Sequence, residues 1–399
     1  MVSTFFVSLL NYGFNLLMAR GLSLSDYGEL ISVLSYIILL TIPFGAFGTI
    51  LVKRIGAVDP SERRHYATSV ERWLYGRVIR AMPLLLIVGG VGYWLLSANS
   101  NLQITSVIFI LVMALCTLLL NIYFYSLQAY KEFFIYGVYL TVIALFRFLG
   151  GAAIIHTRGG LTFVYILTVA LTLFQITWGH FLIRKKHPQK TLNIQFQKIT
   201  TYLKRKSILI PALATFGILG LANVDVIMVK KLMTGSEAGL YGAVTLLAKI
   251  IFYVTSPILS VGYIFFTGKE HQHQAEQLLL IISGLVLAMG LCAIGFYTVF
   301  SPFVIHLFFD QRFNALQSIL WLSGVYGTLY SLVTIFSNYF ISKNSFYSTL
   351  PLLALAFQVV AIYFFHSSLA QVLLVNSALL SVLLAVYIAA FSHYARRTL

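Results

Sequence analysis

The sequence predicts an all-α polytopic membrane protein with about 12 transmembrane helices. The chain is 59% hydrophobic and 10% charged, with a mean hydropathy of +0.90, which is more apolar surface than one soluble core buries. Its apolar residues form twelve runs, each near the roughly 20 residues that a spanning helix needs. The runs are too long for barrel strands, and backbone groups facing lipid must otherwise be satisfied within a helix.

The predicted spans follow one another with mostly short connections. They are Val2–Met18, Glu29–Val52, Ala81–Leu96, Ile104–Leu127, Phe133–Ile155, Leu161–Ile183, Ser207–Val229, Gly239–Phe266, Gln277–Phe300, Ala315–Ile341, Ser345–Phe365 and Leu369–Phe391. Of the two longer cytoplasmic connections, Val52–Arg80 has the charge pattern of an amphipathic helix on the inner leaflet.

The chain repeats a spaced motif at an offset of 214 residues. The matching residues are Tyr27, Gly28, Pro43 and Gly48 in the first copy and Tyr241, Gly242, Pro257 and Gly262 in the second. Because six spans per copy return the chain to the same side, the copies are expected to be parallel repeats. We predict an N-terminal six-helix lobe at 1–183, a basic cytoplasmic linker at 184–206 and a C-terminal six-helix lobe at 207–399.

The net charge of +16 reflects orientation in the membrane and does not indicate a nucleic-acid partner. Of the 27 Lys and Arg residues, 20 fall in alternate loops and five in the opposite set. The five are Arg20, Arg158, Lys230, Lys231 and Arg312. This asymmetry is the positive-inside pattern, so both termini are expected to face the cytoplasm, with the basic loops against anionic membrane lipids.

The predicted cytoplasmic linkers carry none of the patterns expected of an enzyme. They contain no P-loop, no paired carboxylates and no metal-ligand spacing. We therefore expect a secondary transporter, with no catalytic residue, no metal and no cofactor.

Polar residues recur at helical spacing inside several predicted spans. Those that we assign to a cavity wall are Asn11, Asn15, Asn121, Tyr253, Tyr326 and Tyr330. Hydrogen bonding between helices would explain one such stripe. Their occurrence in both halves favours a hydrated central cavity, in which a tyrosine ring stacks on a sugar while its hydroxyl bonds.

Three charged residues lie at predicted membrane depth, where charges are rare and usually functional. Asp225 is the only carboxylate placed inside a predicted span, whereas Arg147 and Lys249 are both cations. Asp225 either pairs with Lys249 structurally or binds H⁺ or Na⁺ for coupling. Arg147 lacks a carboxylate of similar depth in its half, so it either bonds helix carbonyls, snorkels, or holds an exogenous anion. The planar guanidinium suits phosphate.

Three stretches carry a resemblance to a known family. They are ARGLSLSDYGEL at 19–30, SLQAYKEF at 126–133 and NVDVIMVKKLMTGSEAGLYGAV at 223–244. The pattern resembles the polysaccharide (Wzx-type) flippases of the multidrug/oligosaccharidyl-lipid/polysaccharide (MOP) exporter superfamily.

The resemblance implies two MATE-like six-helix bundles around a central cavity that opens to one side at a time. It also implies a bacterial inner-membrane protein that inverts an undecaprenyl-pyrophosphate-linked oligosaccharide. By that analogy Arg147 and Lys249 hold the pyrophosphate, and Arg20 lies near the outer mouth. Polysaccharide polymerase or assembly proteins are the implied partners. The alternative is a cation-coupled multidrug exporter of the same fold. An enzyme acting on lipid-linked sugars usually has a large outer loop, which this sequence lacks.

Overall fold

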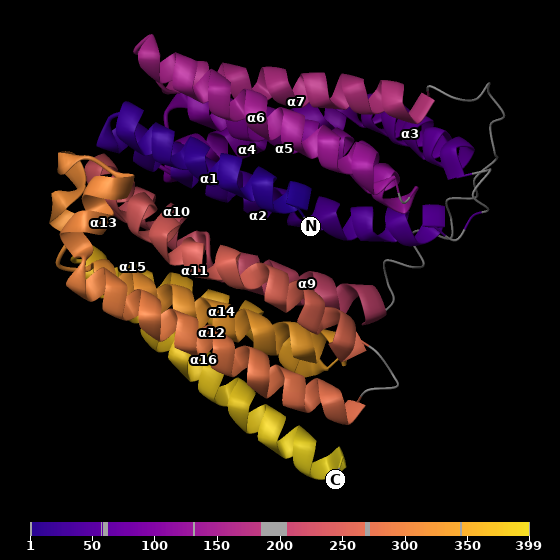
Figure 1. Cartoon of the computed structure of the whole chain (residues 1–399). Helices are drawn as coiled ribbons and strands as arrows, with labels where there is room; N and C mark the ends of the chain where they lie inside the picture. The colour runs from indigo at the N-terminus through magenta and orange to yellow at the C-terminus, as the bar shows by residue number, and fades with distance from the viewer. Residues whose placement is uncertain are drawn as a thin grey trace. The chain divides into compact units, whose positions relative to one another are not determined.

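The computed structural model describes residues 2–56, 58, 63–130, 132–184, 206–267, 272–343 and 345–398. Within these ranges every regular element is helical (Figure 1). The predicted linker at 184–206 lies almost wholly outside the described residues.

One or more helices overlap each of the twelve predicted spans. They are α1 (Val2–Gly21), α2 (Leu24–Gly56), α3 (Arg63–Arg80), α4 (Met82–Asn99), α5 (Ile104–Ala129), α6 (Phe133–His156), α7 (Leu161–Arg184), α9 (Lys206–Leu221), α10 (Val224–Leu232), α11 (Gly235–Thr267), α12 (Gln272–Val299), α13 (Ser301–Phe308), α14 (Leu320–Ser342), α15 (Leu350–Phe364) and α16 (Leu369–Thr398). Two short 3₁₀ helices complete the set, η2 (Gln311–Leu316) and η3 (Phe346–Thr349). In the described part of the chain nine helices are long and apolar enough to cross a membrane, and the bent pair α9 and α10 makes ten. The all-α polytopic fold class is confirmed.

The chain divides into two compact units. Unit 1 comprises Met1–Leu22 and Tyr36–Lys204, and unit 2 comprises Ser23–Ser35 and Arg205–Leu399. Helix α2 therefore contributes its first part to unit 2 and its remainder to unit 1.

Two helices of unit 2 begin with the same local device. At the start of α2, the Ser23 hydroxyl accepts from the Asp26 backbone N–H at 3.1 Å and donates to its carboxylate at 2.8 Å. At the start of α11, the Glu237 carboxylate accepts from the Thr234 backbone N–H at 2.9 Å, and Thr234 Oγ1 accepts from the Glu237 N–H at 3.3 Å. Such pairs satisfy N–H groups that a helix leaves without partners.

Unit 2 is built around α14. In the most apolar stretch of this helix 83% of the residues are buried inside the protein, against 22% in that of α12. It packs against α11, α12 and α16. A helix surrounded in this way can bury polar side chains on several faces, and α14 supplies Tyr326 and Tyr330 to the site described below.

Unit 1 pairs α1 with α6 and α5 with α7. Helix α3, predicted as an amphipathic helix on the inner leaflet, packs one face into the core of the unit. Its residues Ala67 and Val70 are fully buried in the same apolar cluster as Tyr123 of α5 and Tyr139 of α6. The reason is that one face of α3 is apolar enough to join the core of the unit, while Arg72, Arg77 and Arg80 are exposed.

Candidate functional site

The seventh predicted span is broken in the structure. Helix α9 ends at Leu221, and α10 starts at Val224 with a bend of 41°. A break leaves the last four carbonyls of α9 without helical partners, which is costly away from water.

All four carbonyls find donors. Ile218 O accepts from the Tyr330 hydroxyl at 3.3 Å, and Leu221 O accepts from Tyr326 at 3.2 Å and from Gln358 Nε2 at 3.0 Å. Asn223 donates to the two carbonyls between these. Its side-chain amide donates to Leu219 O at 2.7 Å, and its backbone N–H donates to Gly220 O at 3.0 Å. The bend is therefore a capped, specified structure.

Asp225 lies in the first turn of α10, directly after this break, and is fully buried. One carboxylate oxygen accepts from the Tyr241 hydroxyl at 2.7 Å, from Tyr326 at 3.2 Å and from Asn376 Nδ2 at 3.3 Å. The other accepts from the Val226 backbone N–H at 2.8 Å. Four donors around one carboxylate match the needs of a group that, when ionised, only accepts.

The network extends to residues that the sequence analysis missed. Asn376 of α16 also donates to the Tyr241 hydroxyl at 2.9 Å and accepts from Gln358 of α15 at 2.9 Å. Both amides are buried. Their only signal in the sequence is a single amide inside an otherwise apolar run, LVNSALL and AFQVV.

Lys249 of α11 makes no direct ion pair with Asp225, although it interacts with that charge through space. The carboxylate is occupied by neutral donors instead. The structural Asp225–Lys249 pair considered above is therefore not formed, and among the described residues no carboxylate forms an ion pair with the half-buried Lys249.

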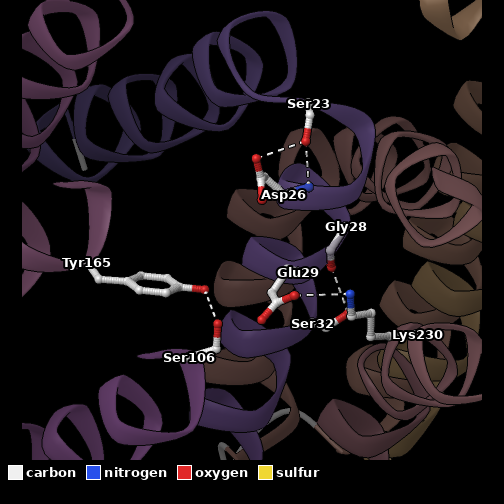
Figure 2. Close-up of polar contacts among 8 residues, drawn as sticks. All are labelled: Ser23, Asp26, Gly28, Glu29, Ser32, Ser106, Tyr165 and Lys230. Carbon is white, nitrogen blue, oxygen red and sulfur yellow. Dashed lines mark hydrogen bonds and ion pairs between the residues drawn. The ribbon is translucent and has the colours of Figure 1, made fainter. Parts of the chain in front are cut away.

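The buried ion pair of unit 2 lies elsewhere. Lys230 Nζ donates to Glu29 Oε2 at 3.1 Å, with the side chains 6% and 3% exposed (Figure 2). The sequence analysis placed Lys230 in an outer loop and Glu29 at the edge of a span. Both expectations are wrong, because Glu29 lies inside α2 and Lys230 in the last turn of α10. Asp225 is thus not the only carboxylate inside a span.

Two glycines allow α2 to approach this close to α11. A Cβ atom on Gly239 would fall 2.0 Å from the Leu24 carbonyl oxygen, and one on Gly28 would fall 2.4 Å from the Gly239 nitrogen. The neighbouring Tyr27 and Tyr241 of the repeated motif are fully buried. Small residues at a helix crossing permit such backbone contact. The repeated Tyr-Gly pairs therefore mark one tight crossing within unit 2.

In unit 1, Arg147 of α6 lies against α1. Its Nη1 donates to Asn11 Oδ1 at 3.5 Å, and its guanidinium carbon lies 4.3 Å above the centre of the Phe14 ring. Its buried Nε has no hydrogen-bond partner within the part of the chain that the structure describes. Arg147 forms no ion pair, so the sequence prediction of an uncompensated cation agrees with the described residues.

The remaining predicted site residues are less closely associated. Asn15 donates to the Asn11 carbonyl at 2.9 Å, and its own buried Oδ1 lacks a partner. Asn121 is half-buried, Arg20 is exposed at the end of α1, and Tyr253 is 46% exposed. The structure thus unites Asp225 with Tyr326 and Tyr330 in unit 2, and Arg147 with Asn11 in unit 1. A cavity that joins these two groups remains a prediction.

Sequence comparison finds no matching family model and no matching curated protein. Comparison of structures finds an inward-facing multidrug resistance MATE family transporter of the MOP superfamily, with a TM-score of 0.68 and 14% identity over 98% of this chain and 96% of that one. The lipid II flippase MurJ, in an inward closed conformation, has a TM-score of 0.74 and 13% identity over 98% and 87%. An outward-facing MATE family transporter has a TM-score of 0.60 and 16% identity over 99% and 95%.

At these identities the likeness concerns the fold. It spans nearly the whole chain, and it agrees with the MATE-like architecture that the sequence predicts. The chain is therefore a multi-pass membrane protein with the fold that MATE transporters share with the lipid II flippase MurJ.

Proposed function

We propose that the protein is a flippase that moves an undecaprenyl-pyrophosphate-linked oligosaccharide, the repeat unit of a capsule or O-antigen, from the inner to the outer leaflet by alternating access. Its place would be the bacterial inner membrane, with both termini in the cytoplasm and polysaccharide polymerase or assembly proteins as neighbours. It acts as a secondary transporter and not as an enzyme.

The observation that carries this proposal is the environment of Arg147. Among the described residues, this guanidinium group inside an apolar helix has one long hydrogen bond, to Asn11, and a buried Nε with no acceptor. Buried polar groups are rarely left without partners, so an orphan of this kind calls for an explanation. A bound phosphate oxygen would supply the missing acceptor and the missing negative charge.

The physical problem solved by such a site is the transfer of a charged, hydrated headgroup. Moving a pyrophosphate and its sugars through hydrocarbon would require removing their water, at a large cost in free energy. The polyprenyl tail can stay in lipid. In this proposal the charges of Arg147 and Lys249 compensate that of the pyrophosphate, and Arg20 acts near the outer mouth. Polar side chains form hydrogen bonds with the sugars or stack on them: Asn11, Asn15, Asn121, Tyr253, Tyr326 and Tyr330. Movement of one lobe against the other would expose the site to each side in turn.

Asp225 is proposed to couple H⁺ or Na⁺ to this movement. The support is its position at a helix break within a span, a placement that recurs at ion sites in transporters. A cation-coupled multidrug exporter is the second candidate, because the same buried carboxylate and the likeness to MATE transporters also fit it. Its cationic substrates would be repelled by Arg147 and Lys249. Uptake of cationic dyes into vesicles therefore separates the two functions.

The direct test uses proteoliposomes that contain the purified chain and a fluorescent undecaprenyl-pyrophosphate disaccharide. Flipping is measured as the fraction of label that becomes accessible to a membrane-impermeant quencher. Arg147→Ala is expected to slow flipping roughly 10- to 100-fold, because a charge-assisted bond to phosphate is lost. Arg147→Lys should recover part of the rate, since the charge remains and the planar fork does not.

The matched control is Arg158→Asn, which removes an exposed arginine just beyond the end of α6. Arg158 has a positive φ of 54°, a conformation that asparagine tolerates. Flipping by the control should equal that of the unaltered chain. Equal rates for Arg147→Ala and the unaltered chain would remove Arg147 from the site and leave the proposal without its main support.

A further inference from the structure

A cavity of about 600 Å³ lies in unit 1 between α3 and α7, apart from the residues assigned to transport. Its α3 side includes Arg72, Gly76 and Ile79, and its α7 side includes Ile176, His180 and Phe181. Pockets for small ligands commonly measure about 300–1,000 Å³, so the space suits part of an amphiphilic molecule.

A buried acid organises the polar end of this cavity. The Glu71 carboxylate, 1% exposed, lies 2.6 Å from His180 Nδ1 and accepts from the Tyr123 hydroxyl at 2.7 Å. The Tyr75 hydroxyl lies 3.1 Å from that of Tyr123. Because Nδ1 is committed to Glu71, Nε2 is the ring nitrogen of His180 that remains for a ligand.

The cavity lies at the depth of a lipid headgroup. Tyr123 is 19 residues from the start of α5 at Ile104, and His180 is 19 residues from the start of α7 at Leu161. At about 1.5 Å per residue both lie about 28 Å along their helices. A hydrocarbon core is about 30 Å thick, which places the polar end near the far interface. This is the side to which the positive-inside pattern assigns the basic loops.

The lining combines one arginine, Arg72, with apolar side chains that include Ile79, Ile176 and Phe181. Helix α3 carries five arginines and one acid, Glu71, which already faces His180. Ile79 lies seven residues, or about 10 Å, along α3 from Arg72. Ile79 and Phe181 are each 67% exposed, as apolar side chains facing lipid tails are. A soluble anion would leave this apolar surface unused.

We propose that the cavity binds one phospholipid with an anionic headgroup. The phosphate accepts from the Arg72 guanidinium and from the Nε2–H of a doubly protonated His180, whose Nδ1–H is donated to Glu71. An acyl chain lies against Ile79, Ile176 and Phe181. Glu71 is a positioning residue that holds the imidazole ring. The bound lipid would connect α3 to α7. This proposal does not depend on whether the chain flips an oligosaccharide.

The test uses the full chain in detergent, titrated with dioleoylphosphatidylglycerol or dioleoylphosphatidylcholine, with bound lipid counted by native mass spectrometry. One phosphatidylglycerol should bind about tenfold more tightly than phosphatidylcholine, and Arg72→Gln should remove that preference. Gly76→Leu should block both lipids. A Cβ at Gly76 meets only the end of Arg80, at 4.0 Å, so the larger side chain enters the cavity without disturbing the helix.

Two matched variants serve as controls. Arg77→Gln removes an exposed arginine whose guanidinium lies 5.6 Å from the Trp73 ring and outside the cavity. Gly90→Leu adds the same side chain to α4 at a position with nothing within 4 Å. Both should bind phosphatidylglycerol as the unaltered chain does.

Unchanged binding by Gly76→Leu, or equal affinity for the two lipids, would overturn the proposal. Leucine favours helix more than glycine, so Gly76→Leu should fold. If it does not, Arg72→Gln decides alone, because it alters only an exposed side chain.

Discussion

Asp225 in unit 2 and Arg147 in unit 1 are both charges inside apolar helices, yet their surroundings differ. Asp225 accepts from four donors on four different residues, whereas Arg147 has one hydrogen bond of 3.5 Å and an orphaned Nε. The hydrogen-bonding capacity of the carboxylate is met by protein donors, whereas that of the guanidinium is only partly met by the described residues. Burial alone therefore does not distinguish the two charges, whereas their hydrogen-bond partners do, and the orphaned Nε is the reason that we propose Arg147 for the ligand.

Breaking the Glu29–Lys230 pair, a third buried charged group with a built-in partner, should have the largest effect on stability. Glu29→Ala leaves the Lys230 ammonium buried without its charge partner, which should cost about 3–5 kcal/mol of unfolding free energy. The double variant Glu29→Leu with Lys230→Met removes both charges and should recover most of that loss. Thermal or denaturant unfolding in detergent measures both. A double variant as unstable as the single one would mean that the pair contributes more than mutual neutralisation.

Asp225→Ala should have the next largest effect. The Tyr241 hydroxyl loses its acceptor, while Tyr326 and Asn376 each keep one other bond. Leaving a buried donor unsatisfied costs about 1–3 kcal/mol, so we expect a loss of about 2 kcal/mol in the same unfolding measurement. Full stability in this variant would show that the donors find water or new partners, and the contrast with Arg147 would then fail.

Arg147→Met should have the smallest effect on stability, within about 1 kcal/mol. The variant keeps the side-chain length against Phe14 and gives up one long bond to Asn11. Its unfolding midpoint is compared with that of Asp225→Ala under the same conditions. A loss as large as that of Asp225→Ala would identify Arg147 as a structural residue and weaken its assignment to the ligand.

Much of the fold could be predicted, because a spanning helix is a property of one continuous run of sequence. Each of the twelve predicted spans overlaps a helix, and charge at predicted membrane depth singled out Asp225, Lys249 and Arg147 as candidate site residues. The partners were harder to predict. Glu29 and Lys230 are 201 residues apart, and their pairing depends on the close crossing at Gly28 and Gly239.

Single amides were also beyond sequence reasoning. Gln358 and Asn376 meet only when α15 and α16 pack together, and nothing local distinguishes them from amides that face a cavity. The break after Leu221 could not be predicted, for a similar reason. Its donors come from α14, α15 and Asn223 itself, so the apolar run reads as one unbroken span.

The corner between α9 and α10 has a mechanical consequence. Straightening it would release carbonyl oxygens that the buried side chains of Tyr326, Tyr330 and Gln358 now hold, and each released carbonyl would need a new donor. The corner should act as a brace and not as a joint. Asp225 would then travel with α14 and α15 as one rigid block, and any pivot that the protein uses must lie at another point along the chain.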